Sequence, residues 1–129
     1  MAMHDRPEIL LADCELRRRR LLERALRRDG YGVLTTSDGR ELLAQVEYLM
    51  AVHGHRIGGR ITVDSFAVIT SPVLETLSGL AVCDCIERAG WTIPIVVLPE
   101  GGAGDEGEID SVRSRLLGTM QPPHAATRH

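Results

Sequence analysis

The chain has 129 residues, of which 43% are hydrophobic and 26% are charged, and this make-up is typical of one soluble domain. All 15 basic residues are arginine, which excludes every mechanism that needs a lysine ammonium group, such as Schiff-base chemistry or a lysine that binds a phosphoryl group. Aromatic residues make up only 3% of the chain, and this argues against a surface that stacks bases or sugars.

No stretch of the chain approaches the ~20 apolar residues that a membrane-spanning helix needs, and residues 1–7 lack the apolar block of a signal peptide. We therefore expect a cytoplasmic protein. An odd number of cysteines does not make a disulfide framework, and Cys83 and Cys85 are too close in sequence for a standard metal knuckle. The prediction is three reduced thiols, no metal site and no cofactor.

Short apolar runs alternate along the chain with segments of helical spacing. We expect strands at 8–12, 32–36, 66–70 and 93–98, and helices at 16–29, 41–52 and 108–117 and from Ser78 onward. This alternation predicts an α/β fold with a parallel sheet covered by helices on both faces. We expect one domain over residues 1–120.

The segments between these elements are rich in glycine or proline. Residues 53–62 contain three glycines and no periodicity, which predicts an irregular loop, and residues 99–107 predict a flexible acidic loop. Residues 121–129 have the composition of a disordered tail. Only residues 118–121 then remain for a fifth strand.

Four segments carry a resemblance to a known family: ILLADCE at 9–15, DGYGVLTTSDGRELL at 29–43, SGLAVCDCI at 78–86 and IPIVVL at 93–98. In this order and spacing they resemble the receiver domain of bacterial two-component response regulators, over Glu8 to Leu98. The resemblance implies a flavodoxin-like fold. It also implies phosphoryl transfer from a histidine kinase to an aspartate that ends the third strand, beside a magnesium ion held by an acidic turn.

The chain departs from that family pattern at the positions that carry the chemistry. The family spacing places Ser71 where the phosphoacceptor aspartate is expected, and a serine hydroxyl without a base is a poor nucleophile at neutral pH. The acidic turn keeps Asp13 and Glu15, but Cys14 stands where the family has its direct metal ligand, and a thiol is a poor partner for magnesium. Pro99 replaces the hydroxyl residue that ends the fourth strand, and the family's lysine is absent. We interpret this as an inactive phosphorylation site.

The sequence therefore predicts a non-enzymatic, phosphorylation-independent protein-interaction module in bacterial signalling. Its candidate surface includes Arg17, Arg20, Arg24 and Arg27, on a helix with seven of the 15 arginines. Acidic residues interleave with them, and we therefore do not expect a nucleic-acid partner. The chain is also too short for the last helix of the receiver fold, and this predicts an apolar surface beside the 16–29 helix that a partner protein or a second copy would cover.

Three other functions remain open at this point. A working phosphorelay receiver would need another acid, such as Glu75 or Asp13, as its phosphoacceptor. A small redox protein would use Cys14 at the loop mouth. A nucleic-acid adaptor would bind through the arginine-rich helix, with strong salt dependence.

Overall fold

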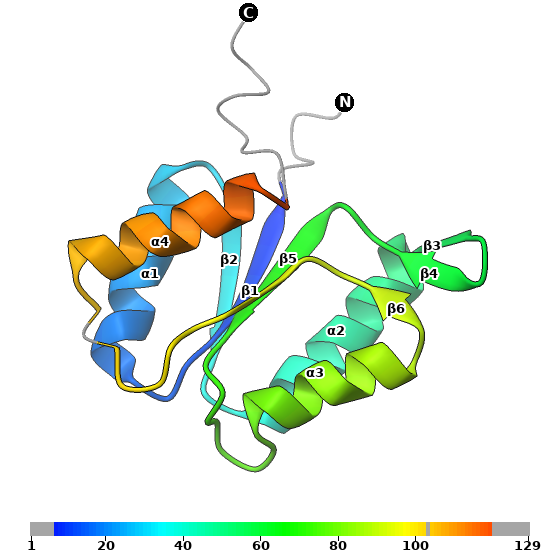
Figure 1. Cartoon of the computed structure of the whole chain (residues 1–129), viewed down its shortest axis with the longest axis horizontal. Coiled ribbons are helices and arrows are strands. Elements are labelled where there is room, and N and C mark those ends of the chain that lie inside the picture. The colour runs from blue at the N-terminus through cyan, green and yellow to red at the C-terminus, as the bar shows by residue number, and fades with distance from the viewer. Residues whose placement is uncertain (1–6, 103, 120–129) are drawn as a thin grey trace, which may run out of the picture.

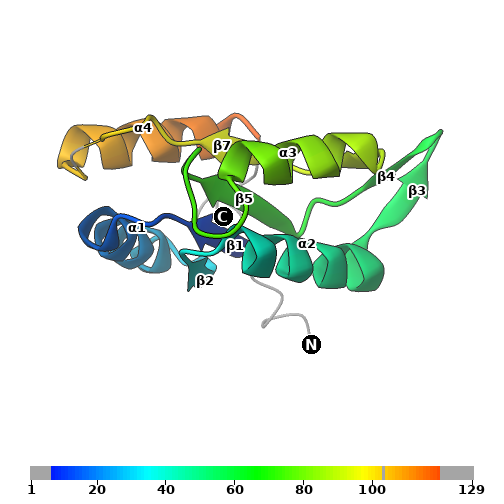
Figure 2. The same ribbon diagram turned by 90° about the horizontal axis from the view of Figure 1, so that it is seen from below.

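The computed structural model describes residues 7–102 and 104–119, and it has three layers. A parallel sheet of strand order β2-β1-β5-β7 has α1 and α4 on one face and α2 and α3 on the other (Figures 1 and 2). The bounds are β1 (Glu8–Ala12), α1 (Leu16–Arg28), β2 (Gly32–Thr36), α2 (Gly39–His53), β5 (Phe66–Thr70), α3 (Gly79–Arg88), β7 (Ile95–Val97) and α4 (Glu106–Leu117). The predicted fold class is confirmed.

The central strand β1 divides the core into two halves because alternate side chains of a strand point to opposite faces. Ile9 and Leu11 pack in the cluster on the α1 and α4 face, whereas Leu10 and Ala12 pack in the cluster on the α2 and α3 face. All four side chains are fully buried. A continuous apolar run is therefore what a strand covered on both faces requires.

Residues 55–62 form a β-hairpin, and the prediction of an irregular loop over 53–62 was wrong. The strands β3 (His55–Ile57) and β4 (Arg60–Thr62) pair antiparallel across the two-residue turn Gly58-Gly59, and Gly58 has a φ of 63°. A tight hairpin turn of this kind needs residues that tolerate positive φ, which glycine does. The short strand β6 (Trp91–Thr92) pairs with β4. The strand predicted at 93–98 is shorter in the structure, where β7 covers only Ile95–Val97.

The last helix, α4, packs beside α1. Val112 and Leu116 join Leu22 and Leu26 of α1 in one buried cluster, and Arg113 donates two hydrogen bonds of 2.8 Å to Asp29 at the end of α1. The uncovered apolar surface predicted beside α1 was therefore wrong, because α4 occupies that place. Within residues 7–102 and 104–119 no strand lies beyond β7, and the predicted tail at 121–129 falls outside the described residues.

Gly79 allows α3 to begin against the end of β5. A Cβ atom at this position would lie 1.9 Å from the carbonyl oxygen of Ser71, which is backbone and cannot move aside cheaply. We expect Gly79→Ala to lower the free energy of unfolding by roughly 1–3 kcal/mol, measured by urea denaturation. Gly59→Ala is the matched control because the space around Gly59 is open. Equal effects of the two changes would contradict this packing.

Candidate functional site

The carboxyl ends of β1, β5 and β7 meet at one edge of the sheet, the usual place for a ligand in such folds. An open hollow of about 310 Å³ lies there. Its lining residues are Asp13, Cys14, Glu15, Arg18, Ser71, Val73, Glu100 and Gly101. The structure thus brings the predicted acidic turn and Ser71 together, as the resemblance implied.

Asp13 is buried and paired with an arginine from α1. The Arg18 Nε donates to Asp13 Oδ2 at 2.5 Å, and Arg18 Nη2 donates to Asp13 Oδ1 at 3.2 Å, which is a two-pronged ion pair. Arg18 is 3% exposed and Asp13 is 1% exposed. The hydrogen bond to Asp13 raises the pKa of the Arg18 guanidinium, and the arginine remains charged in its buried position.

Arg18 also holds the segment that follows β7. Its Nη1 donates to the Pro99 carbonyl oxygen and to Glu108 Oε2, both at 2.9 Å. Gly102 and Gly104 let the chain lie close over this arginine, because a Cβ on Gly102 would meet Arg18 Nη1 at 2.4 Å. One guanidinium therefore links β1, α1, the segment after β7 and α4.

Ser71 is buried at the end of β5, where the resemblance placed the phosphoacceptor. Its N–H donates to the Ala12 carbonyl oxygen at 2.8 Å, and its Oγ accepts a hydrogen bond of 3.3 Å from the Val73 N–H. Among the residues that the structure describes, no carboxylate or imidazole hydrogen-bonds to this hydroxyl. A serine nucleophile is usually activated by such a hydrogen-bonded base.

The other predicted pocket residues make local contacts. Cys14 is exposed, and its Sγ donates to the Val73 carbonyl oxygen at 3.2 Å. Glu15 is the N-cap of α1 and accepts from the Arg18 N–H at 3.3 Å. Pro99 contributes only its carbonyl oxygen, to Arg18. Glu75, the alternative phosphoacceptor, is exposed and does not line the hollow.

Binding of a divalent cation at the acidic turn would have to compete with Arg18. Both carboxylate oxygens of Asp13 already accept hydrogen bonds from the guanidinium, and Oδ1 accepts a further one of 3.1 Å from the Glu15 N–H. Outside residues 1–6, 103 and 120–129, no three His, Cys, Asp or Glu side chains are placed to hold a metal ion. The positive charge beside Asp13 in this structure belongs to the chain itself.

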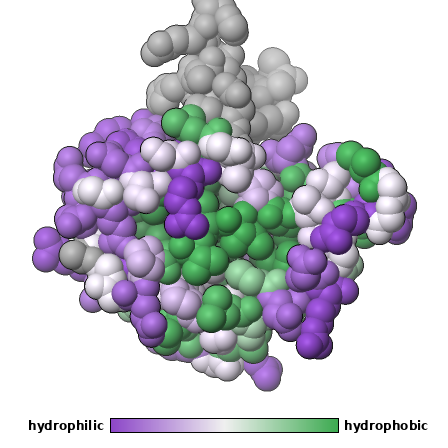
Figure 3. Space-filling view, viewed as in Figure 1, coloured by the Kyte–Doolittle hydropathy of each residue, from purple (hydrophilic) through white to green (hydrophobic). Residues whose placement is uncertain are grey.

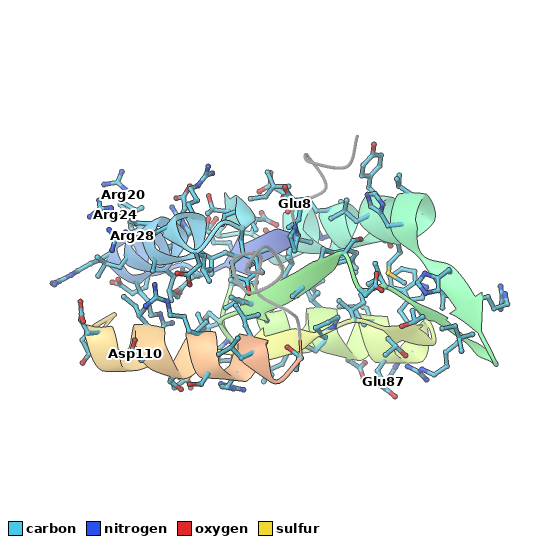
Figure 4. The ribbon with its side chains drawn as sticks, turned by 90° about the horizontal axis from the view of Figure 1, so that it is seen from above. Glu8, Arg20, Arg24, Arg28, Glu87 and Asp110 are labelled. Carbon is cyan, nitrogen blue, oxygen red and sulfur yellow. The ribbon has the colours of Figure 1, made fainter. Side chains whose placement is uncertain are left out.

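The predicted arginine surface lies on the outer side of α1. Arg17, Arg20 and Arg24 are exposed and, within the described part of the chain, make no ion pair. Figure 4 shows Arg20, Arg24 and Arg28 along α1, and the last two line a hollow between α1 and α4 together with Asp110. Arg27 differs, because it pairs with Glu23 and donates to the Val33 carbonyl oxygen at 2.9 Å.

Solved structures share this fold. The receiver domain from the hybrid histidine kinase CckA has a TM-score of 0.58 and 21% identity, and the match covers 88% of this chain and 99% of that one. The receiver domain of the Francisella response regulator 1452 has a TM-score of 0.55 and 14% identity over 90% and 80%. The bacteriophytochrome response regulator AtBRR has a TM-score of 0.51 and 27% identity over 88% and 77%.

The chain therefore has the flavodoxin-like fold of receiver domains. No protein-family model and no curated protein matches its sequence. Among the described residues, no helix has both the length and the apolar character to cross a membrane.

Sequence reasoning missed two residues of the site, Arg18 and Glu108. Arg18 lies four residues before Leu22, and this spacing puts it on the apolar side of α1. A buried arginine needs a buried acid, and Asp13 lies only five residues earlier. Glu108 had no such indication, because the pair joins residues 90 positions apart.

Proposed function

We propose that this chain is a receiver-like signalling domain that works as a protein-interaction module without accepting a phosphoryl group. The observation that carries the proposal is the Arg18–Asp13 ion pair beside Ser71. Acyl-phosphate chemistry in this fold needs a carboxylate nucleophile and cations over the developing charge. Here the position at the end of β5 offers a hydroxyl, and the remaining buried carboxylate is bound to a guanidinium.

The contacts of Arg18 also favour a single arrangement of the site. Four oxygen atoms of three residues accept its hydrogen bonds: both carboxylate oxygens of Asp13, the Pro99 carbonyl oxygen and one oxygen of Glu108. A switch would have to break this buried network, and removal of one partner from such a network is costly. We infer that partner concentration, rather than a phosphoryl group, sets the output of the domain.

The surface proposed for a protein partner combines α1 with the loops around the hollow. Arg17, Arg20 and Arg24 project from it without an ion pair inside the described chain, and Cys14 and Val73 add exposed groups at the hollow. This surface suits a partner with acidic side chains, because unpaired arginines attract carboxylates and fix orientation.

Beryllofluoride with magnesium tests the proposal because this anion adds to a phosphoacceptor carboxylate as a phosphoryl analogue. We expect the thermal midpoint of unfolding to stay within roughly 1 °C on addition of both, since a ligand that does not bind cannot stabilise the native state. The matched control is magnesium with fluoride alone. A midpoint that rises only when beryllium is present would support a working phosphorelay receiver instead.

A further inference from the structure

In the part of the chain that the structure describes, the sheet ends at β7, and no strand pairs with the outer edge of β7. The ladder between β5 and β7 includes a 2.9 Å bond from the Val68 N–H to the Pro94 oxygen and a 2.8 Å bond from the Leu98 N–H to the Thr70 oxygen. In a parallel strand, every second residue hydrogen-bonds through its backbone to the same neighbouring strand. The backbone N–H and C=O groups of Val96 therefore face β5, as the Pro94 oxygen and the Leu98 N–H do. The backbone N–H and C=O groups of Ile95 and Val97 face away from the sheet.

The surface around this edge is apolar. Figure 3, in the view of Figure 1, shows a hydrophobic area in the middle of the face between α4 and α3, where the strand β7 lies. Ile95 and Val97 of β7 are half-buried there. A sheet edge with outward backbone groups and apolar side chains is a template for a further strand.

A strand that followed α4 directly is a poor occupant of this edge. The connection from β5 through α3 to β7 passes on the α2 face and is right-handed, as nearly all parallel connections are. A connection from β7 through α4 to a strand beside β7 would pass on the α1 face and would be left-handed. The chain after α4 also carries Pro122-Pro123, which cannot donate to a ladder.

A second copy of the folded domain is also a poor occupant. Figure 2 shows β7 between α4 and α3, with both helices extending as far outward as the strand. Antiparallel pairing of two β7 edges would bring the α3 and α4 helices of both copies into the same space. A single extended segment has no such helices and is narrow enough to lie between them.

Arg115 of α4 gives the edge a charge preference. Its Nη1 donates to the Val97 carbonyl oxygen at 3.0 Å, and its side chain is exposed beside the open strand. The opposite edge is similar, because Arg27 donates to the outward Val33 oxygen of β2 at 2.9 Å. The β7 edge lies in the hydrophobic area of Figure 3. An incoming strand would displace Arg115 from Val97 and leave the guanidinium free to bind a carboxylate.

We propose that the open edge of β7 binds one extended, β-branched segment of another polypeptide, with an acidic side chain of that segment beside Arg115. The segment adds a strand to the sheet through the backbone groups of Ile95 and Val97. Binding at the β7 edge does not depend on whether position 71 accepts a phosphoryl group. An experiment can therefore contradict this proposal without contradicting the proposed function, and the reverse.

The test uses the full chain and a blocked seven-residue peptide of alternating threonine and valine with one central aspartate. Amide hydrogen exchange is followed by NMR. We expect saturation with the peptide to slow exchange at Ile95 and Val97 by about ten-fold or more, and to leave Thr35 on the β2 edge unchanged. An otherwise identical asparagine peptide should bind roughly two- to five-fold more weakly, and Arg115→Ala should abolish that difference.

Two edge variants serve as a matched pair. Val97→Pro removes an outward N–H from β7, and Thr35→Pro removes the corresponding N–H from β2, because Gly32 and Thr36 face β1. Loss of peptide binding only in Val97→Pro supports the proposal. Unchanged exchange at Ile95 and Val97, or equal effects at both edges, would overturn it. Slow exchange at Ile95 and Val97 before peptide is added would also overturn the proposal. Loss of this protection on deletion of residues 120–129 would identify the tail as the occupant, and its loss on dilution would identify a second copy.

Discussion

Arg18→Met is expected to lower the free energy of unfolding by about 3–5 kcal/mol, because it leaves two acids buried without their partner. Asp13 is 1% exposed and the side chain of Glu108 is 9% exposed, and neither can regain full hydration in the folded state. Methionine keeps much of the aliphatic volume of arginine, so the loss reports mainly on charge and hydrogen bonds. Chemical denaturation in urea at neutral pH measures the change.

Two further variants separate the ion pair from simple packing. Arg20→Met removes an exposed arginine from the same helix and should change stability by no more than about 0.5 kcal/mol. The double variant Asp13→Asn with Arg18→Met should be less destabilised than the sum of the single changes, because it removes the buried charge together with its partner. Additive effects in this cycle would show that the pair has no energetic coupling.

Leu116→Ala should destabilise the protein by about 2–5 kcal/mol, the range for a large aliphatic side chain removed from a core. Leu116 is 1% exposed and belongs to the same buried cluster as Leu22 and Leu26 of α1, Val96 of β7 and the following Leu98. The neighbouring Leu117 is 60% exposed, and Leu117→Ala should change stability by no more than about 0.5 kcal/mol. The pair tests whether α4 covers the sheet beside α1, and similar effects at both positions would contradict that placement.

The sequence predicts the sheet and its helices because their patterns are local. Continuous apolar runs such as Glu8–Ala12 mark strands buried on both faces. Ser78 marks a helix start that the structure confirms, whereas the helix predicted at 41–52 begins two residues earlier, where Asp38 caps it. The hairpin at 55–62 was missed although its signal was present. Gly58-Gly59 is a two-residue turn sequence, but its short exposed strands lack the apolar alternation that usually accompanies one.

The site was predictable only in part. The resemblance placed Asp13, Cys14 and Ser71 at the carboxyl ends of neighbouring strands, and the structure does bring them together. The role of Arg18 depends on Glu108 and the Pro99 carbonyl, which are distant in sequence. The position of α4 could not be predicted either, because its periodicity identifies an inward face but not which neighbour that face meets.

The most direct test of the proposal that this chain accepts no phosphoryl group is intact-protein mass spectrometry after incubation with acetyl phosphate and magnesium. The Arg18–Asp13 pair and the hydroxyl at position 71 predict that the mass does not change, in the wild type and in Ser71→Ala alike. A receiver domain with an aspartate phosphoacceptor, treated in parallel, shows that the donor is active. Appearance of one phosphoryl group on the wild-type chain, labile as an acyl phosphate is, would contradict the account.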